Sequence, residues 1–140
     1  MECLVNKVEI GASYEEKIFD FWVDFQFKNG KTIKAFDYKP FDLRNFEGKT
    51  ISVLLLAGYI TNKETGQEIK GTITDEIFLE KEDWSDCFGG LTETKMYRFC
   101  TEHGTFLISK SEMDEDAINT GSELTLRFAR IDIVAYKTGT

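Results

Sequence analysis

Large apolar and polar residues alternate along a stretch near the start of the chain. From Ile18 to Lys28 an apolar residue stands at every second position, and most of the positions between are polar. The apolar set is Phe19, Phe21, Val23, Phe25 and Phe27. A period of two places one side of a β-strand in a core. The pattern therefore predicts a long strand with one aromatic face turned inward.

A hairpin is predicted to follow this strand. Asn29-Gly30 is a turn signal, and Thr32 to Tyr38 reads as the returning strand. A two-residue turn would set Phe25 opposite Lys34, whereas a three-residue loop with a left-handed glycine sets it opposite Ile33. Directly opposed residues share a face, so the second register, which joins apolar to apolar, is predicted.

Further segments also read as strands. Thr50 to Thr61 is apolar on both faces, which suits a strand covered on both sides, and its Gly58 suggests a bend or bulge. Ile69 to about Leu79 is its expected partner. Another hairpin is predicted from Met96 to Ile108, with its turn near His103.

The last predicted strand, Glu123 to Tyr136, changes the phase of its apolar positions. Leu124, Leu126 and Phe128 form one alternating set, and Ala129, Ile131 and Ile133 form the next. A one-residue offset turns every later side chain over, so this flip predicts a bulge or corner.

Helix signals are few, and they complete a fold-class prediction. Ser111 to Asn119 predicts a short helix, and Phe41 to Phe46 a single turn. About seven or eight strands indicate an all-β domain, a small closed or partly open antiparallel barrel of OB-like or Greek-key type. A β-sandwich is the alternative. No linker or repeat divides residues 1–140, so a single domain is expected.

Charge and cysteine content narrow the setting. Lys plus Arg number 17 against 25 Asp plus Glu, a net charge of −8, which disfavours phosphate backbones unless basic residues gather on one face. The chain starts without a basic and apolar leader and has no apolar run of membrane length, so a cytoplasmic location without membrane contact is expected. Three cysteines, an odd number, suit free thiols in a reducing compartment.

The most informative asymmetry is a basic segment between residues 28 and 49, with six basic residues against three acidic ones and several aromatic rings among them. Single-strand binders on OB-like folds combine basic groups with rings that stack on bases. Lysines on a hairpin also serve solubility and edge protection, and the alternation assigns most of these rings to the core. The candidate binding residues are Lys28, Lys31, Lys34, Lys39, Arg44 and Lys49.

A second candidate contact element is the loop-like segment that holds Trp84 and Phe88, flanked by acidic residues. Aromatic residues in such a loop can anchor a partner protein. Inward packing, as a lid over one end of the barrel, is the favoured alternative because large apolar side chains gain most from burial.

Metal and catalytic signatures are weak. Cys87, Cys100, His103 and Cys3 would use every cysteine and the single histidine, but only Cys100 and His103 are close in sequence, whereas structural zinc sites usually have close ligand pairs on both sides of a loop. No nucleophile, base and orienting group stand out. We therefore expect no cofactor, no metal and no enzymatic activity.

Three hypotheses of function remain from the sequence. The leading one is a non-enzymatic binding or interaction module for a protein partner. The alternative is single-stranded nucleic-acid binding through the basic segment 28–49. A metal-dependent or thiol enzyme is the third.

Overall fold

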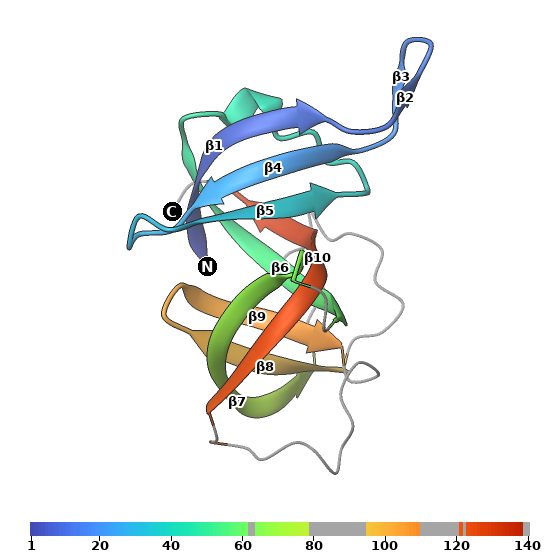
Figure 1. The fold of residues 1–140 in the computed structure, drawn as a ribbon. Helices are drawn as coiled ribbons and strands as arrows, with labels where there is room; N and C mark the ends of the chain where they lie inside the picture. Colours follow the sequence, from blue (N-terminus) through green and yellow to red (C-terminus); the bar gives the residue numbers. More distant parts are fainter. Residues whose placement is uncertain (62–63, 79–94, 110–120, 122, 139–140) are drawn as a thin grey trace.

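Most segments in which apolar and polar residues alternate form β-strands in the structure. The computed structural model describes residues 1–61, 64–78, 95–109, 121 and 123–138 (Figure 1). Within these ranges the only helical element is the 3-10 turn η1 (Arg44–Phe46), inside the segment predicted to form a single turn. None of the described segments is a helix long and apolar enough to cross a membrane. The all-β class is confirmed.

Eight strands form one sheet, and a two-stranded sheet stands apart from it. The eight strands are β1 (Glu2–Ile10), β4 (Phe21–Gln26), β5 (Thr32–Asp37), β6 (Thr50–Ile60), β7 (Gln67–Phe78), β8 (Lys95–Thr101), β9 (Gly104–Ser109) and β10 (Glu123–Lys137). The smaller sheet pairs β2 (Ser13–Tyr14) with β3 (Lys17–Ile18).

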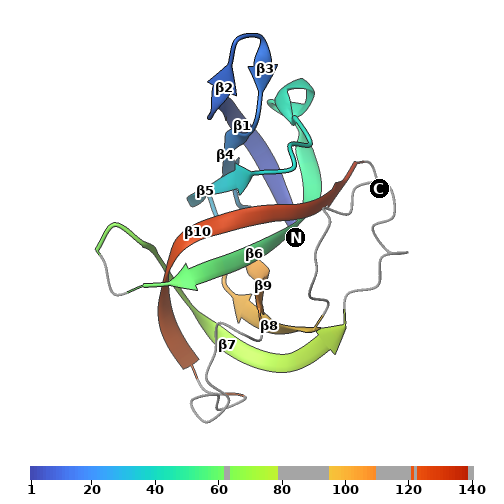
Figure 2. The same cartoon turned by 90° about the vertical axis from the view of Figure 1, so that its right-hand side faces the viewer.

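The hydrogen bonds of the large sheet close on themselves twice. The first ring runs β1, β4, β5, β10 and β6, and β6 returns to β1. The second runs β6, β9, β8, β7 and β10. The long strands β6 and β10 belong to both rings and cross between them (Figures 1 and 2). The β5–β10 and β6–β9 pairings are parallel, so the prediction of a purely antiparallel sheet is wrong.

Strand β10 changes rings near its middle. It pairs with β7 as far as Phe128 and with β6 from Phe128 onward. The buried side switches between Phe128 and Ile131, which confirms the predicted change of phase, while Ala129, placed inward by the pattern, is exposed. The register shift lies later, between Ile133 and Ala135.

The β4–β5 hairpin has the predicted register. Phe25 lies opposite Ile33, and Gly30 has the left-handed φ of 86° that the bulged loop requires. The predicted inward face is wrong at one position, because β4 begins at Phe21 and Phe19 is 44% exposed. Phe21 is 1% exposed, so the covered part of the aromatic face ends there.

Strand β6 does not pair with β7, in contrast to the prediction. Its two edges are occupied by β10 on one side and by β1 and then β9 on the other. Its pairing with β10 passes Gly58 without a register shift. The helix predicted for Ser111 to Asn119 lies outside the described residues.

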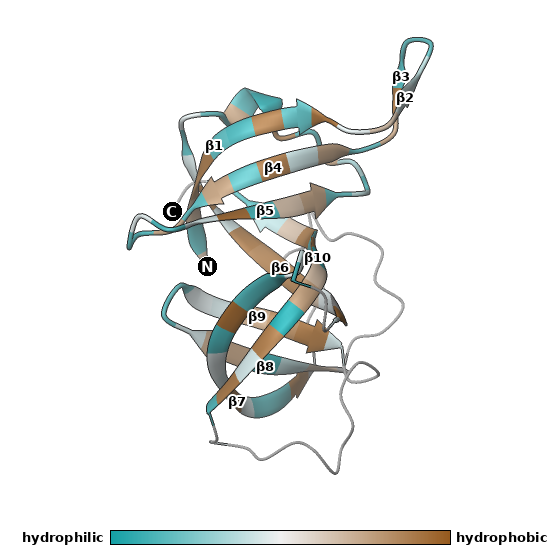
Figure 3. Ribbon diagram, viewed as in Figure 1, coloured by the Kyte–Doolittle hydropathy of each residue, from teal (hydrophilic) through white to brown (hydrophobic). Residues whose placement is uncertain are grey.

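One hydrophobic cluster runs through both rings. It joins residues of the first ring such as Val23 and Phe25 to residues of the second such as Phe99 and Phe106. Apolar and polar residues alternate along the strands around it (Figure 3). Each large side chain that is buried in this way stabilises the fold by about 1.5 to 3 kcal/mol. The rings therefore share a core, and in the part of the chain that the structure describes their outer faces and turns are the surfaces to consider for binding.

Candidate functional site

A row of half-buried side chains crosses the outer face of β4 and β5. Trp22 stands opposite Phe36 in the strand register, with ring centroids 4.7 Å apart and planes tilted by 44°. The neighbouring pair, Val23 and Ala35, points into the core, and successive positions on a strand point to opposite sides. The two rings are therefore in contact on the side of the sheet that faces away from the core.

Arg130 extends this row from β5 to β10. Its guanidinium carbon lies 5.0 Å from the centre of the Phe36 ring, within the range of a cation–π contact. Asp132 holds the guanidinium: Nη2 donates to Oδ2 at 3.2 Å, and Nε lies 2.7 Å from Oδ1 in an ion pair that is not directed as a hydrogen bond. The Arg130 side chain is 34% exposed. We call Trp22, Phe36 and Arg130 the stacking row.

Asp132 lies in the sheet beside this row. It is 8% exposed and is paired with Phe36 where β10 and β5 run parallel. Burial raises the pKa of its carboxyl, and the hydrogen bond and charge of Arg130 oppose that shift. Burial also raises the pKa of Tyr38, and the Asp132 carboxylate adds to that rise. Tyr38 therefore lies within electrostatic reach of the Arg130–Asp132 pair.

Lys34 and Lys39 are the exposed cations nearest in sequence to Phe36. Lys34 lies opposite Asp24 in the β4–β5 register. The side-chain amide of Gln67 fixes the backbone here, accepting from Lys34 N at 3.1 Å and donating to Lys34 O at 3.0 Å. These two hydrogen bonds tie β5 of the first ring to Gln67, the first residue of β7 in the second ring.

Three of the six predicted basic residues are engaged in exposed ion pairs. Lys28 Nζ lies 3.1 Å from a Glu2 oxygen, and Lys31 Nζ lies 2.6 Å from Glu102 Oε1. Arg44, at the other end of the β4–β5 hairpin, contacts Asp42 at 2.7 Å and stands 5.0 Å from the Phe21 ring centre. Lys28 and Lys31 thus lie at one end of the hairpin and Arg44 at the other.

The remaining predicted residues are not drawn together either. Among the described residues no ion pair is formed by Lys34, Lys39 or Lys49, which are exposed and lie respectively within β5, after β5 and before β6. Trp84 and Phe88 lie outside the described residues, so their proposed contact role stays a prediction.

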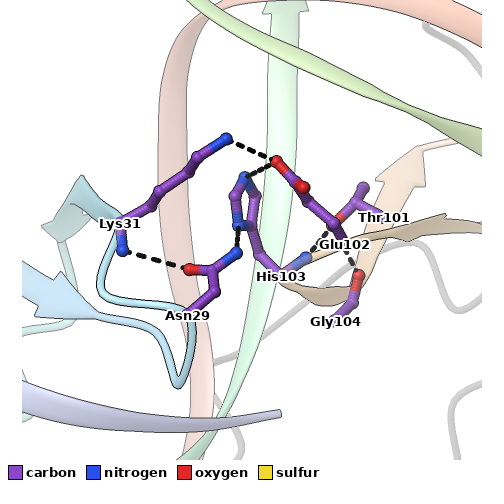
Figure 4. A network of polar contacts seen from close by, with 6 residues as sticks. All are labelled: Asn29, Lys31, Thr101, Glu102, His103 and Gly104. Carbon is purple, nitrogen blue, oxygen red and sulfur yellow. Dashed lines mark hydrogen bonds and ion pairs between the residues drawn. The ribbon is translucent and has the colours of Figure 1, made fainter.

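A cleft of about 380 Å³ lies where the β4–β5 turn meets the β8–β9 turn. Figure 4 shows the polar contacts there. His103 stacks on Phe27 with ring centroids 4.7 Å apart, and its Nδ1 lies 2.9 Å from the Asn29 amide nitrogen. Lys31 pairs with Glu102 across the same junction. Of the charged side chains that line this cleft, Glu2 pairs with Lys28 and Glu102 with Lys31, while the N-terminal ammonium donates to the backbone oxygen of Val53.

The possible metal ligands in the sequence are Cys3, Cys87, Cys100 and His103, and no metal site is expected from them. In the described part of the chain no group of three or more metal-binding side chains gathers. Cys3 is buried and Cys100 contacts Thr74 and Thr105, both cysteines being free thiols as expected. Cys87 lies outside the described residues.

No protein-family model, no curated protein and no solved structure matches the chain.

The sequence contained a signal for the stacking row that alternation alone did not use. Trp22 stands at a position that the pattern reserves for polar side chains, and a large aromatic residue on the solvent side of a strand is a candidate contact. The predicted hairpin register, which sets Phe25 opposite Ile33, also sets Trp22 opposite Phe36, so this pair could be predicted from the sequence. Arg130 could not be assigned to it, because the parallel pairing of β5 with β10 joins segments far apart in the chain.

Proposed function

We propose that the protein binds single-stranded nucleic acid on the outer face of β4, β5 and β10. The observation that carries this proposal is the stacking row, in which Trp22, Phe36 and Arg130 are in contact and partly exposed on three neighbouring strands. Aromatic rings and arginine guanidinium groups are the side chains on which unpaired bases stack.

The proposal treats the first ring as an OB-like barrel. In chain order its strands are β1, β4, β5, β6 and β10, so β4 and β5 are the second and third. The first three form a meander, and the fifth pairs with both the third and the fourth. OB-folds are five-stranded Greek-key barrels that bind oligonucleotides on the face of strands two and three. The stacking row lies on the corresponding face.

Charge sets the expected mode of binding. With a net charge of −8, the chain as a whole repels phosphate; Arg130 belongs to the row, and Lys34 and Lys39 are the exposed cations nearest to Phe36 in the sequence. Each phosphate contact contributes about 0.7 to the logarithmic salt slope for single strands, so three contacts give a slope of about −2. Stacking rather than counter-ion release then supplies most of the affinity.

Fluorescence anisotropy with labelled oligothymidine and oligoadenosine, at low salt, is the direct test. Trp22→Ala and Phe36→Ala should each weaken binding by about tenfold, because stacking on one side chain is worth about 1 to 3 kcal/mol per base. Gln26→Ala, on the same strand but at its other end, is the matched control and should leave affinity unchanged. Thermal unfolding of each variant separates lost binding from lost folding.

Two further measurements sharpen the test. In a Trp84→Phe background Trp22 is the only tryptophan, so its fluorescence should be quenched on addition of the oligonucleotide. Arg130→Lys keeps the charge but loses the planar group, and should weaken binding with little change in salt slope. Failure of both oligonucleotides to bind at low salt, or equal binding by all variants, would reject the proposal.

A further inference from the structure

A hairpin arm formed by residues 10–19 projects from the body of the molecule, away from both rings (Figures 1 and 2). It contains β2 and β3 and continues the β1–β4 hairpin in the same register, with Ile10 opposite Phe21 and Tyr14 opposite Lys17. Phe21 is fully covered, so the arm begins where the core ends.

The base of the arm is held in a defined geometry. Gly11 N donates to the backbone oxygen of Asp20 at 3.0 Å, and Ala12 N donates to Asp20 Oδ1 at 2.7 Å. A Cβ at position 11 would collide with that same carboxylate, so a larger residue there would displace the Asp20 side chain from Ala12 N. Phe19 N closes the base with a 2.8 Å bond to Ala12 O. These hydrogen bonds fix the direction in which the arm leaves the body of the molecule.

The arm exposes large apolar side chains. Ile10 is 50% exposed, Tyr14 69% and Phe19 44%, the highest values among the large hydrophobic side chains that the structure describes. Tyr14 and Phe19 border a shallow depression of about 550 Å³ together with Glu15, Glu16 and Lys17. Concentration of exposed apolar side chains on one projecting element is typical of an interaction site.

The arm lacks sheet partners of its own. In the described structure β2 and β3 pair only with each other, and a two-stranded hairpin is marginally stable alone in water. Burial of Tyr14 and Phe19 against another surface would add the hydrophobic stabilisation that a two-stranded hairpin lacks on its own.

We propose that two copies of this chain associate through their arms about a two-fold axis. A two-fold interface uses the same patch on both chains, and must therefore be complementary to itself. The arm meets this condition: its apolar residues match themselves, and Lys17 of one copy can face Glu15 and Glu16 of the other. Lys17 also lies 5.4 Å from the centre of the Phe19 ring, so the cation already borders the apolar patch.

Sedimentation equilibrium over a range of protein concentrations tests this association. The wild-type chain should form a dimer, and the double substitution Tyr14→Ser and Phe19→Ser should shift its dissociation constant upward at least tenfold. Both side chains are exposed, so thermal unfolding should change little. Phe36→Ser, on the outer face of β5, is the control and should leave the dimer intact. A wild-type chain that stays monomeric at every concentration overturns the proposal.

Exchanged charges test the predicted contacts. Lys17→Glu makes the tip wholly acidic, and Glu15→Lys with Glu16→Lys makes it wholly basic, so each variant alone should be mainly monomeric. An equimolar mixture should form a one-to-one heterodimer. A wild-type dimer that persists in both variants, or a mixture that stays monomeric, overturns the arm-to-arm arrangement.

The dimer is independent of the nucleic-acid proposal, and salt separates the two. Added salt screens both the attraction of Lys17 to the glutamates and the repulsion between two chains of charge −8, so it should change the dimer much less than it weakens oligonucleotide binding. The double substitution Tyr14→Ser and Phe19→Ser should still allow the oligonucleotide to quench Trp22 fluorescence. Trp22→Ala should leave the dimer intact.

Discussion

Asn29 and His103 join the two rings, because the Asn29 amide nitrogen lies 2.9 Å from His103 Nδ1 although 74 residues separate them in the chain. Phe27 stacks under the same imidazole, and Lys31 reaches Glu102 beside it. With Nδ1 accepting from Asn29, the neutral ring carries its proton on Nε2, which lies 3.6 Å from Glu102 Oε1. The junction therefore favours an uncharged histidine.

The His103 titration reports directly on this junction. Burial lowers its pKa from the ordinary value of 6.5, while the Glu102 carboxylate opposes the shift. We expect Glu102→Gln to lower the pKa further and Glu123→Gln, an exposed acidic residue on β10, to leave it unchanged. The chain has one histidine, so NMR titration of its ring proton is unambiguous. A pKa at or above 6.5 in the wild type contradicts the described packing.

The same shift predicts a dependence of stability on pH. Below 6.5 the unfolded chain binds more protons at this histidine than the folded chain does, so stability falls as pH falls from 6.5 through the folded pKa. His103→Gln removes the titrating group, and the difference in unfolding free energy between wild type and variant should shrink over that interval. Urea denaturation at several pH values measures it, and a constant difference would argue against the linkage.

Asp37 is a buried carboxylate that organises the segment after β5. It is 0% exposed and accepts from Phe41 N at 2.8 Å and Asp42 N at 2.9 Å. Asp37→Ala leaves the partly buried backbone donors of Phe41 and Asp42 unpaired and should lower the unfolding free energy by about 2 to 4 kcal/mol. Asp24→Ala, on the outer side of β4, should cost much less. Equal losses by urea denaturation would remove this role from Asp37.

The Asp37 carboxyl should also respond to acid. Burial raises its pKa above 3.8, against the backbone hydrogen bonds from Phe41, Asp42 and Lys39, so the folded chain binds more protons between 3.8 and the folded pKa than the unfolded chain does. Its contribution to stability is therefore complete below 3.8 and is lost as pH rises through the folded pKa. Relative to Asp37→Asn, the wild type should gain stability on acidification across this window, and a relative loss would contradict the sign.

Gly71 marks a close approach of β7 to β8. A Cβ there would lie 2.5 Å from the backbone oxygen of Cys100, an atom held in the sheet, so Gly71→Ala should destabilise the protein by about 2 to 3 kcal/mol. Gly58→Ala is the matched control, because the nearest atom to its added Cβ is Arg130 O at 4.0 Å. Calorimetry should show a large drop in melting temperature for the first variant only.

The two described cysteines should differ in reactivity. Cys3 is 1% exposed, and burial raises the pKa of its thiol to about 11, so little thiolate forms at neutral pH. Cys100 is less buried. In a Cys87→Ser background, intact-mass analysis after brief iodoacetamide treatment should show modification at Cys100 before Cys3. Labelling of Cys3 first would place it nearer the surface than the structure does.

The sequence by itself determined features that depend on neighbouring residues. The period of two defined which face of β4 is inward from Phe21 onward, and Gly30 could adopt the left-handed backbone that selects the bulged register. The change of the buried side along β10 was also readable from the order of its apolar residues, although no register shift accompanies it between Phe128 and Ile131.

Only the tertiary structure decided where along the strand the alternating apolar side chains cease to be buried. Phe19 continues the alternation but stands on the arm, beyond the end of the core, and no local rule measures the length of a core. The strands that pair with β6 come from distant parts of the sequence. The backbone groups along a strand edge can bond to any strand that lies beside it, so the sequence of β6 does not specify its partners. Arg130 joins Trp22 and Phe36 for the same reason: the hairpin register brings the two rings together, but the parallel pairing of β5 with β10 is set by the closure of the ring, which alternation cannot encode.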